Sequence, residues 1–200
     1  MSARSFAGFC LILLGIVRAL SPPSAVADEA PQRFDLARLM AQFADVKVGT
    51  AQFTERRYLR MLKGPLIDSG ILVYAAPNRL EKKTLSPEAE DMVIDGDTLT
   101  ITREGKTETL NLPNYPQIAA FIEGIRATLG GDLGTLQQIY DTDLRGDSGN
   151  WLLELQPRDP AMRAVVRLID ISGSGAAIAR IQTVERDGDR TDMMIVEAGR

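Results

Sequence analysis

The stretch of the chain that decides the fold is Asp91-Met-Val-Ile-Asp-Gly-Asp-Thr-Leu-Thr-Ile-Thr102. Two short runs of apolar and polar residues flank Asp95-Gly96, where a glycine adopts the positive φ that a tight hairpin requires. Similar turn sequences stand at Glu104-Gly105-Lys106 and at Asp187-Gly188-Asp189. The spacing therefore predicts an antiparallel meander, in which short strands are joined by tight turns.

More strand-like runs extend from this hairpin in both directions, separated by turns that contain Gly, Pro, Asn or Ser. We expect about ten or eleven strands, enough for one large and strongly twisted antiparallel sheet. The expected strands cover residues 47–61, 69–75, 79–85, 91–94, 98–102, 107–112, 140–144, 151–156, 163–171, 176–185 and 191–197.

Three short amphipathic helices are expected beside these strands. Asp35 can cap a helix that runs to residue 43, Asn114 can cap one that Pro116 opens, and Asp132 can cap a third. The second and third helices interrupt the series of strands. The predicted fold class is therefore mainly β with short helices (α+β), the helices packing on one side of the sheet.

Several strands are apolar on both faces, as in Ile71-Leu-Val-Tyr74 and Val165-Val-Arg-Leu-Ile169, whereas a sheet with one wet face alternates. Both faces therefore need a cover, and three short helices cover only part of one. A curved sheet with a helical lid over an apolar cleft meets this need. An ordinary closed core without a cavity is the alternative that the periodicity leaves open.

Alternation along the strands and helices selects the residues expected to line such a cleft. A register error of one residue would exchange the two faces of a strand, so the selection rests on parity alone. The expected lining is Phe53, Val73, Met92, Ile94, Leu99, Phe121, Ile122, Ile125 and Trp151. Trp151 suits a closed core as well, since a large aromatic side chain buries much area in either role.

The first 27 residues read as a cleavable secretory signal. Arg4 precedes an apolar run over residues 6–17, and Ala25-Val26-Ala27 offers a small-residue cleavage site. The apolar run is short for a membrane span, which makes a retained anchor the weaker alternative. We therefore expect a periplasmic protein with a single domain over residues 28–200.

Composition excludes several kinds of chemistry. The chain contains no histidine, and its one cysteine, Cys10, lies in the leader. Ser-His-Asp catalysis, Cys/His zinc sites, haem ligation and disulfides are thereby excluded from the mature part. We expect no enzyme, no cofactor and no metal site, and hairpin turns explain the two Asp-Gly-Asp sequences better than calcium does.

Charge argues against some partners. The leader holds two arginines and no acid, so its removal changes the formal charge from −4 to −6. This balance disfavours nucleic acid and gives no overall attraction to anionic lipid. Arg56, Arg57 and Arg60 form the densest group of cations. They either protect an exposed strand edge from pairing or dock an acidic partner.

Four segments carry a resemblance to a known family. They are Gln52-Phe-Thr-Glu55, Gly70-Ile-Leu-Val-Tyr-Ala-Ala-Pro77-Asn78, Val93-Ile-Asp-Gly-Asp-Thr-Leu99 and Trp151-Leu-Leu-Glu-Leu-Gln-Pro157. Their order and spacing resemble the periplasmic outer-membrane lipoprotein carrier (LolA-like) family. The resemblance implies an unclosed, curved antiparallel β-barrel, a half-barrel, with a helical lid over an apolar surface that receives acyl chains.

The resemblance also implies a function. A monomeric carrier would take an acylated lipoprotein or lipid cargo from an inner-membrane exporter to an outer-membrane acceptor. The chain departs from the family pattern at Ala76, where a basic residue is usual, and at Glu55, where glutamine is usual. It therefore resembles a divergent branch of the family, whose cargo is either a lipoprotein or another lipid or lipid-linked molecule.

Two other functions stay open beside the carrier. A non-catalytic interaction module would bury the same apolar faces against a permanent protein partner. An accessory protein or enzyme acting on lipid-linked metabolites would need an acid/base pair built from Asp, Glu, Lys or Tyr.

Overall fold

Eleven antiparallel strands form one sheet in the computed structural model, which describes residues 34–197. The predicted leader, with its alternative of a retained anchor, lies outside the described residues. The strands are β1 (Val48–Tyr58), β2 (Leu66–Ala75), β3 (Arg79–Ser86), β4 (Glu90–Asp95), β5 (Thr98–Arg103), β6 (Lys106–Asn111), β7 (Tyr140–Asp147), β8 (Asn150–Pro157), β9 (Val166–Ser174), β10 (Ala177–Glu185) and β11 (Arg190–Glu197).

The strand order across the sheet is β6-β5-β4-β3-β2-β1-β11-β10-β9-β8-β7. Strands that are neighbours in the sheet are also consecutive in the sequence, as the turn spacing predicts, with one exception. The exception is the central pair, where Phe53 of β1 stands opposite Ile195 of β11. The sheet stays open because its edge strands, β6 and β7, do not pair with each other, and the predicted unclosed half-barrel is confirmed.

The described residues form four α-helices and one 3-10 helix. These are α1 (Leu36–Asp45), η1 (Leu112–Asn114), α2 (Pro116–Gly130), α3 (Leu133–Ile139) and α4 (Pro160–Val165). Asp35 and Asp132 cap α1 and α3 as predicted, each accepting a hydrogen bond from a backbone N–H three residues on. The prediction for Asn114 is wrong, because this residue ends η1 and Tyr115 occupies the N-cap position of α2.

Helix α4 replaces the start of a predicted strand. We expected a strand from residue 163, but β9 begins at Val166. Asp159 caps the helix through the Met162 N–H at 2.9 Å, and Pro160 opens it. This Asp-Pro pair is a helix start signal that the apolar run behind it concealed.

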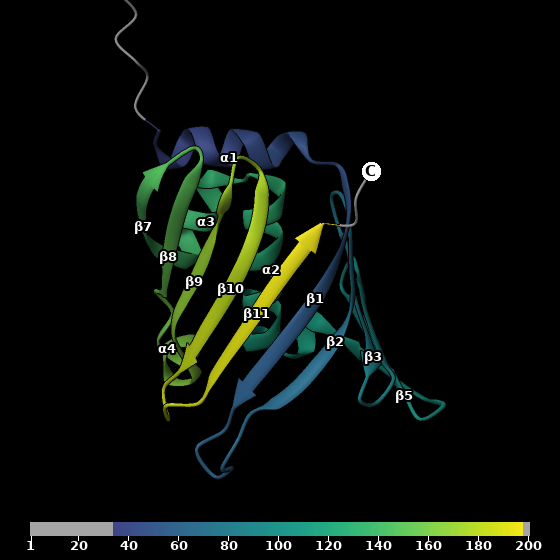
Figure 1. The fold of residues 1–200 in the computed structure, drawn as a ribbon. Helices are drawn as coiled ribbons and strands as arrows, with labels where there is room; N and C mark the ends of the chain where they lie inside the picture. The colour runs from purple at the N-terminus through teal and green to yellow at the C-terminus, as the bar shows by residue number, and fades with distance from the viewer. Residues whose placement is uncertain (1–33, 198–200) are drawn as a thin grey trace, which may run out of the picture. The chain divides into compact units, whose positions relative to one another are not determined.

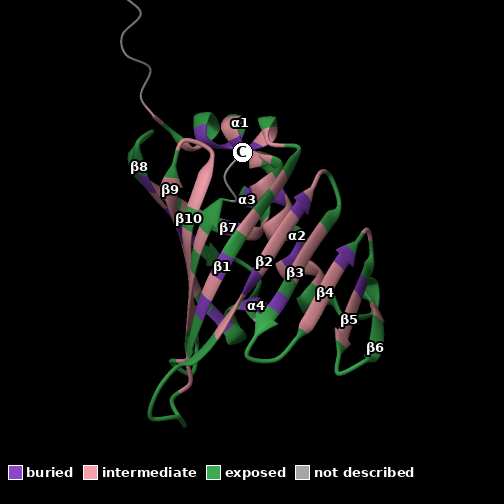
Figure 2. Ribbon diagram, turned by 45° about the vertical axis from the view of Figure 1, so that its right-hand side comes forward, coloured by how far each residue is buried: buried purple, intermediate pink, exposed green. Residues whose placement is uncertain are grey.

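Helices α2, α3 and α4 lie on one face of the curved sheet, here called the inner face, and α1 lies across one end of the sheet (Figure 1). Two separate cores form there. Figure 2 colours the buried segments of the strands and helices purple. The larger joins α1, α2, α3 and α4 to the strands from β7 to β9, and Trp151 lies within it edge-on to Phe43 at 5.7 Å. The smaller joins Ile122 of α2 and Leu112 of η1 to β4 and β5.

The opposite, outer face has no helical cover among residues 34–197. It mixes ion pairs, such as Arg180 with Asp192 at 2.7 Å, with half-buried apolar side chains such as Val93 and Leu152. The expectation that both faces need a cover is therefore wrong for this face, since polar neighbours share it with the apolar residues.

Candidate functional site

The predicted cleft residues divide among three places. Most belong to the two cores already described, where helices and strands pack directly on each other. Trp151 and Phe121 lie in or against the larger core, and Met92, Ile94, Leu99 and Ile122 lie in or against the smaller one. Ile125 is half-buried on α2, and Phe53 is buried on β1 outside both cores.

Val73 is the one predicted lining residue that lies on the other face. It stands opposite Thr50 of β1, whose neighbours Gly49 and Ala51 share the inner face with Phe53. Leu72 and Tyr74 therefore point inward, and the parity assumed for this strand is wrong. Burial raises the pKa of Tyr74, and its hydroxyl is buried without a hydrogen-bond partner among the described residues.

A band of apolar residues crosses the inner face between the two cores, and we name it the central strip. It consists of Phe53, Leu72, Met193 and Ile195, of which only Phe53 is fully buried. Gly70 stands opposite Phe53 and leaves room for its ring, since a Cβ at Gly70 would lie 3.0 Å from Phe53 Cε1. The strip is apolar surface on the covered face that neither core uses.

An ion pair lies at one end of the central strip. The Lys82 ammonium donates to the Glu55 carboxylate at 2.5 Å, and Glu55 is only 6% exposed. Lys82 Nζ also lies over the ring of Phe53, 5.1 Å from its centroid. A buried carboxylate of this kind needs its partner, because an unpaired charge away from water is costly.

Beyond this pair the inner face opens into a pocket of about 280 Å³, here called the polar mouth. Arg57 pairs with Asp68 at 2.7 Å on its wall, and Arg103 pairs with Glu90. The lining residues are Arg57, Leu66, Ile67, Asp68, Lys82, Thr84, Pro87, Glu88, Glu90 and Arg103. Lys82 thus belongs both to the mouth and to the end of the apolar strip.

The three arginines predicted to dock a partner do not share one face. Arg56 lies on the outer face, because its β1 neighbour Glu55 points inward. Arg57 lines the polar mouth, and Arg60 lies in the turn after β1, where its backbone N–H donates to the Asp189 carboxylate at 2.8 Å. Because β1 is the centre of the sheet, protection of an exposed edge does not explain these cations.

Trp151 belongs to the structural core. It is 1% exposed, and its indole N–H donates to the carbonyl of Gly175 at 2.9 Å. Tyr140 is equally buried, and this burial raises the pKa of Tyr140 to about 12. Its phenol therefore stays protonated near neutral pH and does not serve as a base.

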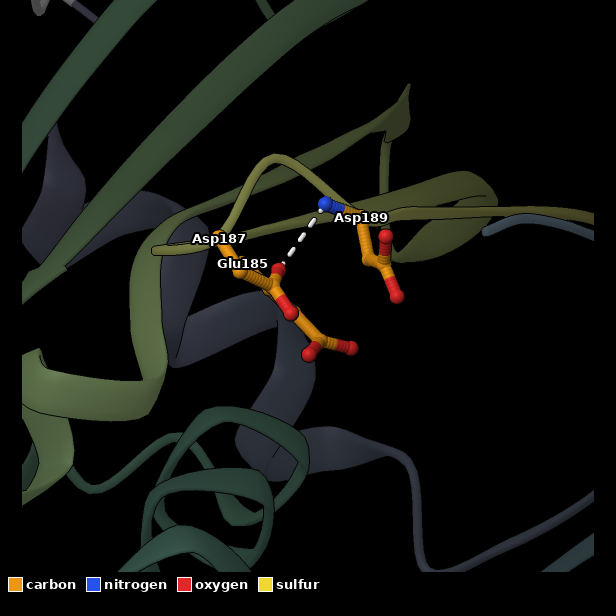
Figure 3. Close-up of side chains that lie close together, drawn as sticks. All are labelled: Glu185, Asp187 and Asp189. Carbon is orange, nitrogen blue, oxygen red and sulfur yellow. Dashed lines mark hydrogen bonds between the residues drawn. The ribbon is translucent and has the colours of Figure 1, made fainter. Parts of the chain in front are cut away.

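Three acids meet at the turn between β10 and β11, as Figure 3 shows: Glu185, Asp187 and Asp189. The turn accounts for them, because Asp187 accepts the Asp189 N–H at 3.0 Å and Asp189 accepts the Arg60 N–H. Gly188 has the positive φ of 96° that the hairpin requires. These contacts are those of a hairpin turn and give no sign of a ligand.

Sequence reasoning missed part of the central strip. Met193 and Ile195 lie on the last strand, and only the pairing of β11 with β1 brings them beside Phe53. The Glu55–Lys82 pair was missed for the same reason, since it spans two strands that flank β2. Among the described residues, moreover, no helix has the length and apolar character to span a bilayer.

Comparisons with solved structures give distant similarities. A LolA superfamily protein from Nitrosomonas europaea is 8% identical, with a TM-score of 0.43 over 78% of this chain and 89% of that one. The MucA/MucB complex of Pseudomonas aeruginosa is 14% identical, with a TM-score of 0.45 over 81% of this chain and 56% of that one. The Mycobacterium tuberculosis lipoprotein LppX is 8% identical, with a TM-score of 0.42 over 80% of this chain and 92% of that one. No curated protein matches the sequence.

The sequence itself matches a family model described as outer membrane lipoprotein carrier protein LolA-like. The match extends from residue 28 to residue 200 and so includes every strand and helix described above. The unclosed antiparallel sheet with short helices is the fold expected from the resemblance. The chain therefore belongs to the LolA-like family of outer membrane lipoprotein carrier proteins.

Proposed function

We propose that this protein is a periplasmic carrier that binds the acyl chains of a lipoprotein or another lipidated cargo along the central strip. The observation that carries the proposal is the strip itself. Leu72, Met193 and Ile195 are apolar, half-buried and outside both cores, on the face that the helices cover. An acyl chain lying there would remove apolar surface from water on both partners.

The energy of such binding is large enough to hold a cargo and small enough to release it. Each buried methylene contributes about 0.8 kcal/mol, which gives roughly 12 kcal/mol for a chain of about sixteen carbons. Loss of contacts with the donor membrane and the ordering of the chain offset most of this gain. Transfer from an inner-membrane exporter to an outer-membrane acceptor can then run downhill in small steps.

Binding rather than catalysis is also the function that the charged groups favour. Glu55 stands opposite Met193 of the strip, and its carboxylate is already held by Lys82 at 2.5 Å. An acid or base must instead be free to exchange a proton with a substrate. The ion pair and the polar mouth beyond it would face the polar end of the cargo.

The proposal is tested by native mass spectrometry and lipid extraction on protein purified from its own periplasm. Ile195→Asp places a charge in the strip, and Val196→Asp places the same charge on the outer face, where Val196 is 66% exposed. We expect acylated material on the wild type and on Val196→Asp, and its loss from Ile195→Asp with circular dichroism unchanged.

Two results would count against the carrier. Wild-type protein free of acylated material and bound to a stoichiometric protein partner would favour the interaction module. Equal retention of lipid by Ile195→Asp and Val196→Asp would place the binding site away from the strip.

A further inference from the structure

The tip of the hairpin between β1 and β2 combines cations with exposed apolar side chains. We define the tip as residues 56–67. It holds Arg56, Arg57, Arg60 and Lys63 and no acidic residue, although the chain as a whole has a formal charge of −4. The segment itself is therefore cationic, while acids lie beside it: Asp68 pairs with Arg57, and the β10–β11 turn with Asp187 and Asp189 contacts Arg60.

The apolar side chains of the tip are the second part of the observation. Met61 is 87% exposed and Ile67 is 51% exposed, while Leu62 and Leu66 are each at least 40% exposed. Figure 1 shows this hairpin reaching beyond the neighbouring strands at the end of the sheet opposite α1. Two of these residues lie in the turn and two at the start of β2, and four large apolar side chains exposed over seven residues mark a binding region.

The tip is tied to the neighbouring β10–β11 turn, so it is presented in a defined direction. The Arg60 N–H donates to Asp189 at 2.8 Å, and its guanidinium donates to the carbonyl of Asp187 in the β10–β11 turn. The guanidinium of Arg190 lies over the ring of Tyr58 at 4.2 Å. Arg56 stands opposite Asp192 of β11, whose carboxylate Arg180 also holds at 2.7 Å. Lys63 forms no ion pair with residues 34–197 and can meet an external anion.

The tip also borders the polar mouth, because Arg57, Leu66 and Ile67 line both. A surface that binds the tip would therefore lie against the opening at the end of the central strip. Apolar residues flanked by cations suit one occupant in particular: apolar side chains enter the acyl region of a bilayer, while Lys and Arg meet anionic headgroups.

We propose that the hairpin tip docks the protein on an anionic lipid bilayer and holds the polar mouth against the headgroups. A cargo chain then passes between membrane and strip with little exposure to water. The purpose of this docking rests on the proposed function, but its test does not, because vesicle binding is measured without cargo.

The experiment is sedimentation of the purified protein with vesicles of phosphatidylcholine, with or without phosphatidylglycerol. We expect binding to the anionic vesicles that weakens as salt is added. Met61→Ser/Leu62→Ser should lower the vesicle affinity by about tenfold or more, and Arg56→Gln/Lys63→Gln should lower it by about tenfold. The matched control is Val48→Ser at the other end of β1, where Val48 is 72% exposed; it should bind like the wild type.

A second measurement follows insertion directly. Met61→Trp places an indole at the tip, and its emission should shift to the blue on anionic vesicles, whereas the buried Trp151 reports no change. Wild-type protein that binds neither kind of vesicle would overturn the proposal, as would tip variants that bind as tightly as Val48→Ser. Failure to bind vesicles, together with a protein partner lost only from the tip variants, would make the tip a protein interface instead.

The two proposals fail in different ways. If the tip docks the membrane, tip variants lose vesicle binding whether or not they carry acylated cargo in native mass spectrometry. Absence of cargo from the wild type, with vesicle binding intact, would contradict the carrier and leave the docking surface in place.

Discussion

The buried ion pair between Glu55 and Lys82 can be tested by removing each partner alone and both together. Glu55→Gln keeps the shape of the side chain without its charge, and Lys82→Met keeps most of the apolar stem. Glu55 is 6% exposed, whereas the Lys82 side chain retains 28% exposure at the edge of the polar mouth. The two single variants should therefore lower the free energy of unfolding by different amounts.

The geometry sets the size of the effect. At 2.5 Å and an effective dielectric constant of about 20, the gross attraction is roughly 6 or 7 kcal/mol, and desolvation of the two charges offsets most of it. Lys82→Met leaves a buried carboxylate unpaired and should destabilise the fold by about 3 to 4 kcal/mol. Glu55→Gln leaves a cation that water reaches, so it should destabilise the fold by about 1 to 2 kcal/mol. The double variant should also destabilise the fold by about 1 to 2 kcal/mol.

Urea unfolding followed by circular dichroism measures these free energies, and the cycle should give a coupling of about 3 kcal/mol. Arg158 and Asp141 form the control pair: they lie 2.7 Å apart but are both more than half exposed, so their coupling should stay below about 1 kcal/mol. Additive single costs at Glu55 and Lys82, or a Lys82→Met variant no less stable than Glu55→Gln, would refute the reasoning.

Three further predictions concern stability. Gly70→Ala should lower the free energy of unfolding by about 2 to 3 kcal/mol, because its Cβ would lie 1.9 Å from the carbonyl oxygen of Lys83 on the next strand. Gly49→Ala, with no atom within 4 Å of the new Cβ, should not destabilise the protein. Equal melting temperatures of the two variants would contradict this. Burial and nearby Glu154 raise the pKa of Asp170, so its ionisation costs stability; Asp170→Asn should melt higher near neutral pH, and the gain should fade as the pH drops toward 3.8. Trp151→Phe should cost about 1 to 2 kcal/mol in chemical unfolding through its lost indole hydrogen bond, and an unchanged midpoint would argue against that bond.

Turn chemistry made most of the fold predictable from the sequence. Positive φ values at Gly96, Gly105 and Gly188 occur at the three turns named from the sequence, since glycine adopts that conformation without strain. The helix caps Asp35 and Asp132 were equally local and equally predictable. Signals of this kind act over two to four residues, so they do not depend on contacts with distant parts of the chain.

The candidate site was predictable only in part. Alternation placed Phe53, Met92, Ile94 and Leu99 on the covered face, yet it placed Val73 there too. Strand β2 is apolar at successive positions, and alternation then contains no information about which parity points inward. Its pairing with β1 decides the matter.

By itself, the sequence determined the eleven strands, the α-helices other than α4, the absence of histidine chemistry and the family of the chain, because each depends on residue types and short spacings. The tertiary structure alone decided that the first and last strands meet. That contact joins Ile195 to Phe53 in one strip, brings Arg60 to Asp189, and so orients the hairpin tip beside the polar mouth. No local sequence pattern predicts this contact, since the paired residues lie more than a hundred positions apart and meet only when the whole sheet has formed.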